Sequence, residues 1–499
     1  MSELVHAKAI TGEYVGTRLE TGVEQYLGIR YAKPPRRWKR AEPLDPSNLV
    51  ISALEDAPAC WQSLMPGEFD ALPPMSEDCL RLNIWTASTE GSKPVYVFIH
   101  GGSYMEGSIR TDCYGGIYCG DGFVRDHPDV VFVNVEYRFG PFGSLDLSTW
   151  DEAGEYPDSN NLQILDQLEA LRWIKANISA FGGDPDRITV GGQSAGSYSI
   201  FVQLALPETR GLYQQAILES SAPGSERIRP MKTPETAAHT AQMMADYLGA
   251  KTLEDLLSAS PIELNAGTDA LFFEPGYAGY DPCADGRLIP KDIHAAWRSG
   301  VNGGVKLLSG TTAGEYSDGM IDMTAAEIRA MTERRTPHVP AEDYEAFLAN
   351  DPEREPKMAM EDMYTDLHIR LRHITATESL IAGGNEAYVY HIAFKPEGNR
   401  MRSIHCSELP YVSGKPDCGC YLNVPDELLA GRNPDPVFGK KVQDVWYNFI
   451  TTGDPNGESL GATWPLYDAE RQATMVFDRE FHVEDGVRRA DLDIARKNA

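Results

Sequence analysis

The feature that most constrains the fold is a serine between small residues, at the junction of a strand-like and a helix-like segment. The pentapeptide GQSAG at residues 192–196 directly follows the β-branched run 188–190 and precedes the helical run 198–205. Small residues permit a sharp strand-to-helix turn that lifts a serine hydroxyl above a sheet edge, and the helix N-terminus favours developing negative charge. The pattern predicts that Ser194 is a nucleophile. The pentapeptide alone leaves a glycine-rich turn with an incidental serine as the alternative.

A second glycine motif stands at the end of an earlier strand-like run. Residues 95–99 are apolar and are followed by His100-Gly101-Gly102, where residues without side chains let backbone N–H groups approach a substrate oxygen closely. With the N–H of Ala195, the amides of Gly101 and Gly102 would form an oxyanion hole, in which losing one donor typically lowers kcat by ~10²–10³. An ordinary strand-end turn is the alternative, but two such motifs in this order disfavour it.

A serine hydroxyl is too weak an acid to attack unaided, so a histidine base must lie downstream. Among eleven histidines, His405 stands in the segment 404–411 (IHCSELPY), a loop that follows the strand-like run 387–394. We therefore predict that His405 is the base. Packing or surface roles are the interpretation of the histidines without such a context, which are His368, His373, His391 and His482.

The predicted acid is Glu315, which would fix the tautomer of the base. It follows the strand-like run 305–308 and precedes His405 in the chain. Asp318 is the local rival. A solvated loop carboxylate is the alternative interpretation of Glu315, and its place between Ser194 and His405 disfavours that alternative.

Strand-like and helical segments alternate along the chain. The clearest helical pattern is 162–174, behind the cap candidates Asp158 and Ser159. The alternation predicts an α/β fold, with a central, mostly parallel twisted sheet flanked by helices, in a single domain of residues 1–499. Helical insertions at about 225–296 and 322–380 are expected over the carboxyl edge of the sheet. The strand-like runs, several of them apolar throughout, are 95–99, 130–135, 188–191, 215–218, 305–308, 387–394 and 474–477.

The balance of charge restricts the partners. The chain has 74 acidic and 45 basic residues, a formal charge of -29, which repels nucleic acid and anionic membrane surfaces. No apolar run approaches the ~18 residues of a spanning helix. The N-terminus lacks the pattern of a secretory signal, so we expect a cytoplasmic protein. A solvated turn, rather than a binding patch, is the interpretation of the basic cluster Arg36, Arg37, Lys39 and Arg40.

Eight cysteines in a chain of 499 residues do not define a disulfide framework. Cys60 and Cys79 enclose an acidic, proline-containing loop that a bridge could close. Cys406, Cys418 and Cys420 offer soft metal ligands near the predicted base, but no two CxxC pairs stand at zinc spacing. We therefore expect no metal and no cofactor.

Further segments, taken jointly with those around Ser194, resemble the type-B carboxylesterase and cholinesterase family across nearly the whole chain. Within that family, the resemblance is to bacterial para-nitrobenzyl-esterase-like carboxylesterases. Joint matching of several motifs is very specific. The segments are 28–35 (GIRYAKPP), 77–85 (EDCLRLNIW), 177–185 (NISAFGGDP), 446–456 (WYNFITTGDPN) and 464–468 (WPLYD).

The resemblance implies an α/β-hydrolase fold with a catalytic triad and an oxyanion hole. It also implies a serine behind the site, at Ser220, and a first disulfide between Cys60 and Cys79. The triad would be Ser194, Glu315 and His405, and the oxyanion hole Gly101, Gly102 and Ala195.

Two residues near the nucleophile depart from the family pattern. Gln193 stands where the family commonly has Glu, which removes a carboxylate, and Ser197 replaces the usual Ala. Neither departure removes a triad role. The loop between Cys60 and Cys79 has no evident counterpart of the tryptophan with which cholinesterases hold a quaternary ammonium group, so a choline-ester preference is not expected.

The expected reaction is hydrolysis of a small-molecule carboxylic ester through an acyl-enzyme on Ser194. The expected assembly is a monomer or a homodimer. One rival is a binding protein of the same fold without activity. Another keeps the chemistry but changes the bond, which would give an amidase, a lipase or a deacetylase of acylated sugars.

Overall fold

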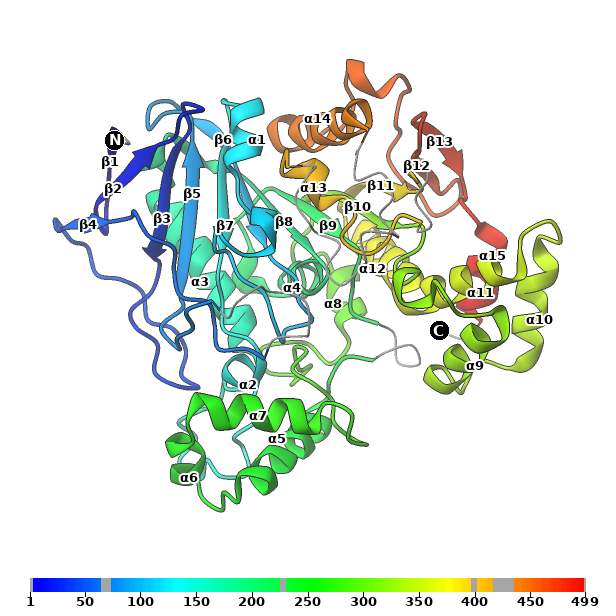
Figure 1. The fold of residues 1–499 in the computed structure, drawn as a ribbon, viewed down its shortest axis with the longest axis horizontal. Helices are drawn as coiled ribbons and strands as arrows, with labels where there is room; N and C mark the ends of the chain where they lie inside the picture. Colours follow the sequence, from blue (N-terminus) through cyan, green and yellow to red (C-terminus); the bar gives the residue numbers. More distant parts are fainter. Residues whose placement is uncertain (1–2, 64–72, 225–229, 396–401, 416–434, 498–499) are drawn as a thin grey trace.

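The computed structural model describes residues 3–63, 73–224, 230–395, 402–415 and 435–497. In these residues a 13-stranded sheet has the order β1-β2-β3-β5-β7-β6-β8-β9-β10-β11-β12-β13, with β4 paired to β2 (Figure 1). The strands are β1 (Glu3–Ala9), β2 (Gly12–Arg18), β3 (Glu24–Arg30), β4 (Val50–Ser52), β5 (Arg81–Thr86), β6 (Lys93–Ile99), β7 (Val131–Val135), β8 (Gly183–Gln193), β9 (Gln215–Glu219), β10 (Lys306–Thr312), β11 (Glu386–Ile392), β12 (Ala473–Phe477) and β13 (His482–Asp485).

The centre of the sheet, from β7 to β12 in this order, is parallel. The outer pairs are antiparallel except β2–β4, which is parallel. Short connections join β1 to β2 and β12 to β13, which gives hairpins. Every residue of β7 and of β12 is buried, as expected for strands covered on both faces. The predicted α/β architecture with a mostly parallel central sheet is confirmed.

Helices flank this sheet and connect its parallel strands (Figure 1). The α-helices are α1 (Asp121–Asp126), α2 (Gly140–Gly143), α3 (Leu162–Asn177), α4 (Ala195–Gln203), α5 (Pro234–Leu248), α6 (Leu253–Ser258), α7 (Pro261–Leu271), α8 (Ile293–Arg298), α9 (Ala325–Arg335), α10 (Ala341–Asn350), α11 (Pro356–Thr365), α12 (Leu371–Ala382), α13 (Leu409–Val412), α14 (Pro436–Thr452) and α15 (Arg489–Arg496). Shorter helical turns include η4 (Asp318–Met320) and η5 (Asp366–Arg370), a π-helical turn between α11 and α12.

The helix predicted at 162–174 is present as α3, but its predicted caps are wrong. Its N-cap is Asn161, whose side chain makes no cap hydrogen bond. The predicted cap side chains bind elsewhere: Asp158 pairs with Arg287, and Ser159 Oγ accepts from the N–H of Leu147 at 3.3 Å. Local sequence favoured these residues as caps, whereas tertiary contacts use their oxygens.

The two predicted insertions are largely helical. The segment 225–296 contains α5, α6, α7 and most of α8, and 322–380 contains α9, α10, α11, η5 and most of α12. In Figure 1 the carboxyl ends of the parallel strands point downward, since α1 precedes β7 at the top and α2 follows it below. Helices α5–α7 lie below that edge, and α9–α11 lie to its lower right. This arrangement puts both insertions on the side from which α4 leaves β8.

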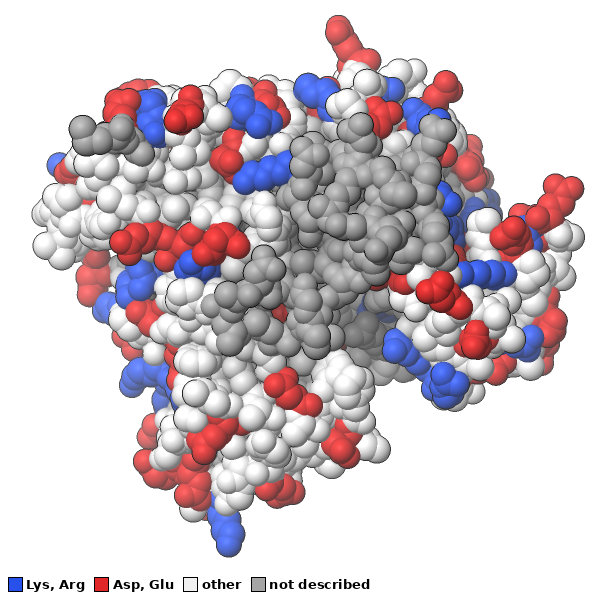
Figure 2. Space-filling view, in the orientation of Figure 1, with Lys and Arg blue, Asp and Glu red and all other residues white. Residues whose placement is uncertain are grey.

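Charges of both signs are interspersed over the face in Figure 2. The basic cluster at 36–40 is neutralised locally, because each member pairs with a carboxylate. The four pairs are Arg36–Glu42, Arg37–Glu77, Lys39–Glu155 and Arg40–Asp158.

None of the described helices is long and apolar enough to cross a membrane.

Candidate active site

Ser194 lies at a strained turn between β8 and α4. Its φ of 56° and ψ of -121° are unusual for a residue with a side chain. The flanking glycines explain why the turn is possible. A Cβ on Gly192 would come within 2.6 Å of the carbonyl carbon of Gly196, and a Cβ on Gly196 within 2.0 Å of the Ile99 oxygen. The predicted steric reason for the small residues is therefore visible at both ends of the turn.

His405 and Glu315 are hydrogen-bonded although ninety positions separate them in the chain. The distance between His405 Nδ1 and Glu315 Oε2 is 2.7 Å, and the His405 N–H also donates to the backbone oxygen of Glu315 at 3.0 Å. The other carboxylate oxygen of Glu315 accepts from the N–H of Thr312 at 2.8 Å. Glu315 is fully buried, whereas the His405 side chain is 23% exposed. The buried carboxylate thus fixes the orientation of an imidazole that keeps access to solvent.

The surroundings of His405 favour its protonated form. Burial lowers the pKa of an imidazole, but the bond to Glu315 and the charges of Glu315, Glu408 and Asp318 outweigh that effect and raise the pKa of His405 above its ordinary value. Tyr316 stacks on the imidazole, with ring centroids 6.1 Å apart. An imidazolium formed during a reaction would therefore be stabilised here.

Gln193 contacts the face of the His405 ring. Its Nε2 lies 3.1 Å from His405 Nε2 and 3.5 Å from His405 Nδ1. A hydrogen bond in the ring plane would leave one ring nitrogen much farther away than the other, so these similar distances describe an N–H above the ring. The contact leaves the in-plane position of His405 Nε2, where a base accepts a proton, to another group.

Three backbone amides near Ser194 remain unused. Among the described residues, the N–H groups of Gly101, Gly102 and Ala195 form no hydrogen bond. Gly101 packs tightly against the nucleophile turn, because a Cβ on it would lie 2.8 Å from the Gln193 oxygen and 2.9 Å from Ser194 Cβ. Buried amides are normally paired, so three unpaired donors beside a serine can accept a negatively charged oxygen as their common partner.

Ser194 and His405 line the same cavity of about 310 Å³. Both insertions contribute to its wall, through Asp281 from the first and through Ile369 and Arg372 from the second. Such concave sites commonly bind small molecules. The residues that the sequence did not suggest include five tyrosines and two further carboxylates, namely Tyr104, Tyr114, Tyr118, Tyr198, Tyr316, Glu106 and Asp281. Only Tyr316, which directly follows Glu315, stood in a motif that could have pointed to it.

The remaining predicted candidates fall outside this hydrogen-bonded pair. Asp318, the rival acid, starts η4, lines the cavity and raises the pKa of His405, but among the described residues it makes no bond to that imidazole. Ser220 directly follows β9 and is buried, with no partner for its hydroxyl among the described residues.

The other histidines have structural contacts. His368 stacks on Tyr364, and His373 Nε2 lies 2.8 Å from Ser309 Oγ in the interior. His391 is buried in β11, and its pKa is well below the ordinary value because of burial. His482 is exposed at the start of β13. The structure therefore brings only His405, among the five histidines considered, to the cavity of Ser194.

The implied disulfide is absent. Cys60 and Cys79 are fully buried and not bridged to each other. Among the described residues, no group of three or more His, Cys, Asp or Glu could hold a metal ion. Cys418 and Cys420, which the sequence offers together with Cys406 as candidate metal ligands, lie outside the described residues.

Comparisons with known proteins agree over the whole chain. Residues 4–495 match the Carboxylesterase family. The chain is 31% identical to the para-nitrobenzyl esterase of Bacillus subtilis, covering 95% of this chain and 94% of that protein. It is 30% identical to the phenmedipham hydrolase of Pseudarthrobacter oxydans, covering 93% and 94%. A solved carboxylesterase of Geobacillus stearothermophilus superposes with a TM-score of 0.83 at 32% identity, covering 98% of this chain and 99% of that one. The chain therefore belongs to the carboxylesterase family, and it is a type-B serine carboxylic-ester hydrolase with the α/β-hydrolase fold.

Proposed function

We propose that Ser194, His405 and Glu315 form the catalytic triad of this carboxylesterase, and that Gly101, Gly102 and Ala195 form its oxyanion hole. The observation that carries the proposal is the 2.7 Å bond between His405 and a fully buried Glu315, at a cavity that Ser194 also lines. A carboxylate that orients an imidazole beside a strained serine is the arrangement that acyl transfer requires.

The reaction proceeds in two halves. Ser194 Oγ attacks the ester carbonyl while His405 Nε2 takes the hydroxyl proton, and the three amides stabilise the oxyanion. His405 then gives its proton to the leaving alcohol, and the acyl group stays on Ser194. Water, deprotonated by His405, attacks the acyl-enzyme and releases the acid, which restores Ser194. The Glu315 carboxyl group, bonded to His405 Nδ1, stabilises the imidazolium in both halves.

A fluorophosphonate probe tests the assignment of the nucleophile. We expect the probe to label the wild-type protein at one site and to leave Ser194→Ala unlabelled. Ser92→Ala, at an exposed serine bonded to Asp184, is the control and should be labelled like the wild type. Labelling of Ser194→Ala would overturn the assignment. No labelling of folded wild type would favour the binding-protein alternative.

The substrate class is proposed as small carboxylic esters, without a metal or cofactor. A panel of esters and anilides graded by acyl-chain length tests this class, because it reports both the size of the cavity and the bond that is cleaved. Hydrolysis of anilides alone would favour an amidase. The monomeric or homodimeric state and the cytoplasmic location stay predictions, which sedimentation and cell fractionation would test.

A further inference from the structure

Two glutamates that the proposed reaction does not use are buried next to the elements that carry the proposed nucleophile and base. Glu219 is the last residue of β9, and its backbone oxygen accepts from the N–H of Ser194 at 2.9 Å. Glu408 follows His405 by three residues and precedes α13. Both side chains are fully buried. One glutamate therefore belongs to the strand that supports the nucleophile, and the other belongs to the loop of the base.

Two glycines on the strands beside Glu219 leave room for the side chains of Tyr96 and Tyr390. Its strand β9 lies between β8 and β10. Tyr96 of β6 lies over β8, because a Cβ on Gly191 would meet its hydroxyl at 2.3 Å. Tyr390 of β11 lies over β10, because a Cβ on Gly310 would meet its ring at 2.4 Å. Burial and the charges of both glutamates raise the pKa of each tyrosine well above its ordinary value. Four acidic side chains thus share one interior region.

Few of their polar atoms have partners. Glu219 Oε1 accepts from Trp446 Nε1 of α14 at 3.1 Å. Among the described residues, Glu219 Oε2, both carboxyl oxygens of Glu408, and the hydroxyls of Tyr96 and Tyr390 have no hydrogen-bond partner. Among the described residues, neither glutamate has a Lys or Arg as hydrogen-bond partner. The charges of Glu315 and His405 also act on Glu408, the first raising and the second lowering its pKa.

Two charged carboxylates in such a region would be strongly unfavourable. An unpaired buried charge is disfavoured by several kcal/mol, and two like charges that sense each other do not both ionise near neutrality. Burial and the charge of Glu408 raise the pKa of Glu219 well above its ordinary value. Burial and the charge of Glu315 raise the pKa of Glu408 as well. A proton in this region also supplies the hydrogen-bond donor that the unpartnered oxygens lack.

We propose that Glu219 and Glu408 hold one proton between them, in a buried hydrogen-bonded network completed by water and by the hydroxyls of Tyr96 and Tyr390. The network ties the His405 loop to β9, whose last residue accepts the N–H of Ser194. Glu219 and Glu408 are then positioning residues, since neither contacts the substrate. Buried water typically makes about three bonds to polar groups that otherwise lack partners, and this region offers five such atoms.

Infrared spectroscopy tests the shared proton. We expect a carbonyl stretch of a protonated carboxyl group in the wild-type protein near neutral pH, which disappears as the pH rises. In Glu219→Gln and in Glu408→Gln the same band should disappear at lower pH, because the remaining carboxyl group no longer faces a like charge. The double Gln variant should lack it. A wild type without the band, single variants with an unshifted band, or a double variant that keeps it would each overturn the proposal.

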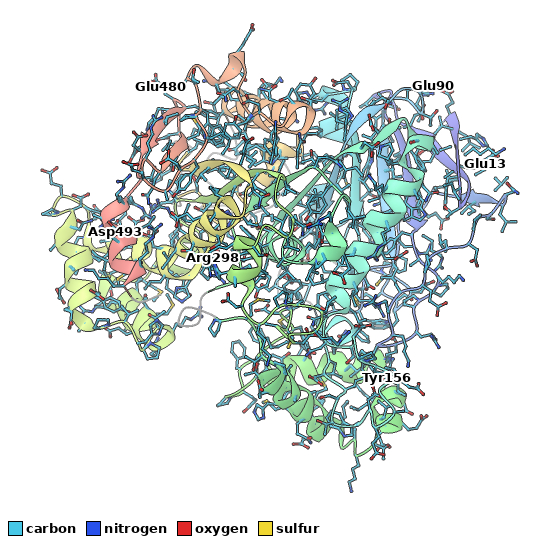
Figure 3. All side chains as sticks on the ribbon, turned by 180° about the vertical axis from the view of Figure 1, so that it is seen from behind. Glu13, Glu90, Tyr156, Arg298, Glu480 and Asp493 are labelled. Carbon is cyan, nitrogen blue, oxygen red and sulfur yellow. The ribbon has the colours of Figure 1, made fainter. Side chains whose placement is uncertain are left out.

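Glu480→Gln is the control for this measurement. Glu480 is an exposed carboxylate before β13, labelled at the rim of the molecule in Figure 3, and its removal should leave the band unchanged. Glutamine nearly matches glutamate in size, so these variants remain measurable even where larger changes would unfold the chain.

Kinetics test the positioning role, and this arm rests on the proposed function of His405. We expect Glu408→Leu to lower kcat by up to ~10²-fold with little change in KM, because the imidazole loses its fixed position. Glu408→Gln should recover most of that loss, since an amide has both a donor and an acceptor. An unchanged kcat in Glu408→Leu, or no recovery in Glu408→Gln, would overturn positioning. Retained turnover in His405→Ala would contradict the proposed base instead, and the infrared result is independent of it.

Discussion

The loop of His405 is anchored by two buried carboxylate clusters that treat charge in opposite ways. Three residues before His405, Arg402 donates to Asp362 of α11 at 2.5 Å. Asp362 also pairs with Arg488 and Arg354, at 2.6 and 3.0 Å. Three residues after His405, Glu408 and its neighbour Glu219 have no such cations among the described residues. The first cluster, called here the arginine cluster, therefore favours the ionised form of Asp362. The second, called here the acid pair, keeps a proton.

The two clusters show that one polypeptide can bury carboxyl groups whose protonation differs in its sensitivity to pH. Burial raises the pKa of Asp362, but the guanidinium groups of Arg488 and Arg402 outweigh this effect and hold the pKa below its ordinary value. In the described part of the chain no Lys or Arg pairs with the acid pair, and burial with neighbouring carboxylate charge raises its pKa values. Ion pairing thus gives an anchor that is constant around neutrality, and proton sharing gives one that responds to pH there.

The largest expected effect is the loss of activity on substitution of Glu315, the carboxylate bonded to His405. Glu315→Gln should lower kcat by ~10⁴-fold, because the amide neither fixes the productive tautomer nor stabilises the imidazolium. Steady-state hydrolysis of a chromogenic ester measures it. Asp318→Asn, at the rival acid, is the matched control. If Asp318→Asn lost as much activity as Glu315→Gln, the assignment of the acid would be wrong.

The next effect breaks the arginine cluster. Asp362→Asn leaves Arg354, Arg402 and Arg488 short of one charge in the interior, so the free energy of unfolding should fall by about 3 kcal/mol. Glu219→Gln should change it by less than about 1 kcal/mol, because an amide can replace a protonated carboxyl group. Urea unfolding followed by fluorescence measures both variants. Equal losses would remove the distinction between the two clusters.

The sequence predicted the central strands of the sheet, and the order of the site residues along the chain, because the signals for both are local. The apolar run 95–99 indicates a buried strand, and β6 is found there. The small residues at 192–196 indicate a tight turn, and the turn at Ser194 is found there. The bond from Glu315 to His405 was predicted in outline, since both residues follow parallel strands whose carboxyl ends share one edge. The catalytic roles of these residues stay predictions.

The acid pair was not visible in the sequence, because it depends on register and packing. Glu219 and Glu408 are separated by 189 positions, and nothing local marks either as buried. Glu219 lies beside Gly310 through the pairing of β9 between β8 and β10. Glu408 directly precedes α13, which packs on α14, the helix whose Trp446 donates to Glu219. The helix caps failed for a related reason, since tertiary contacts took the oxygens of Asp158 and Ser159.

A pH titration of stability separates the clusters by sign. Glu408 has a pKa raised to about 7, so its protonated form stabilises the fold fully below its unfolded value of ~4.3, and this contribution is lost as the pH rises toward 7. We expect a loss on the order of 2 kcal/mol over that range, which Glu408→Gln removes. Asp362 has a lowered pKa, so its contribution is lost only as the pH falls through its folded value. A wild-type stability that rises between pH 5 and 7, with Glu408→Gln unchanged from it, would contradict the acid pair.

The smallest effect concerns the pH at which the base becomes active. The pKa of His405 is raised, so kcat/KM should increase with pH and level off above the ordinary histidine value of ~6.5. Asp318 contributes to that rise from an exposed position, where salt screens it. Asp318→Asn should therefore move the midpoint down by a few tenths of a unit at low salt and by less at high salt. The carboxyl groups of Glu315 and Glu408 are buried, so their influence on the midpoint of the kcat/KM profile should persist at high salt. A pH–rate profile at two ionic strengths distinguishes the effect of Asp318 from that of the buried glutamates. Equal salt sensitivity of Asp318→Asn and Glu408→Gln would mean that solvent reaches the acid pair, contrary to its burial.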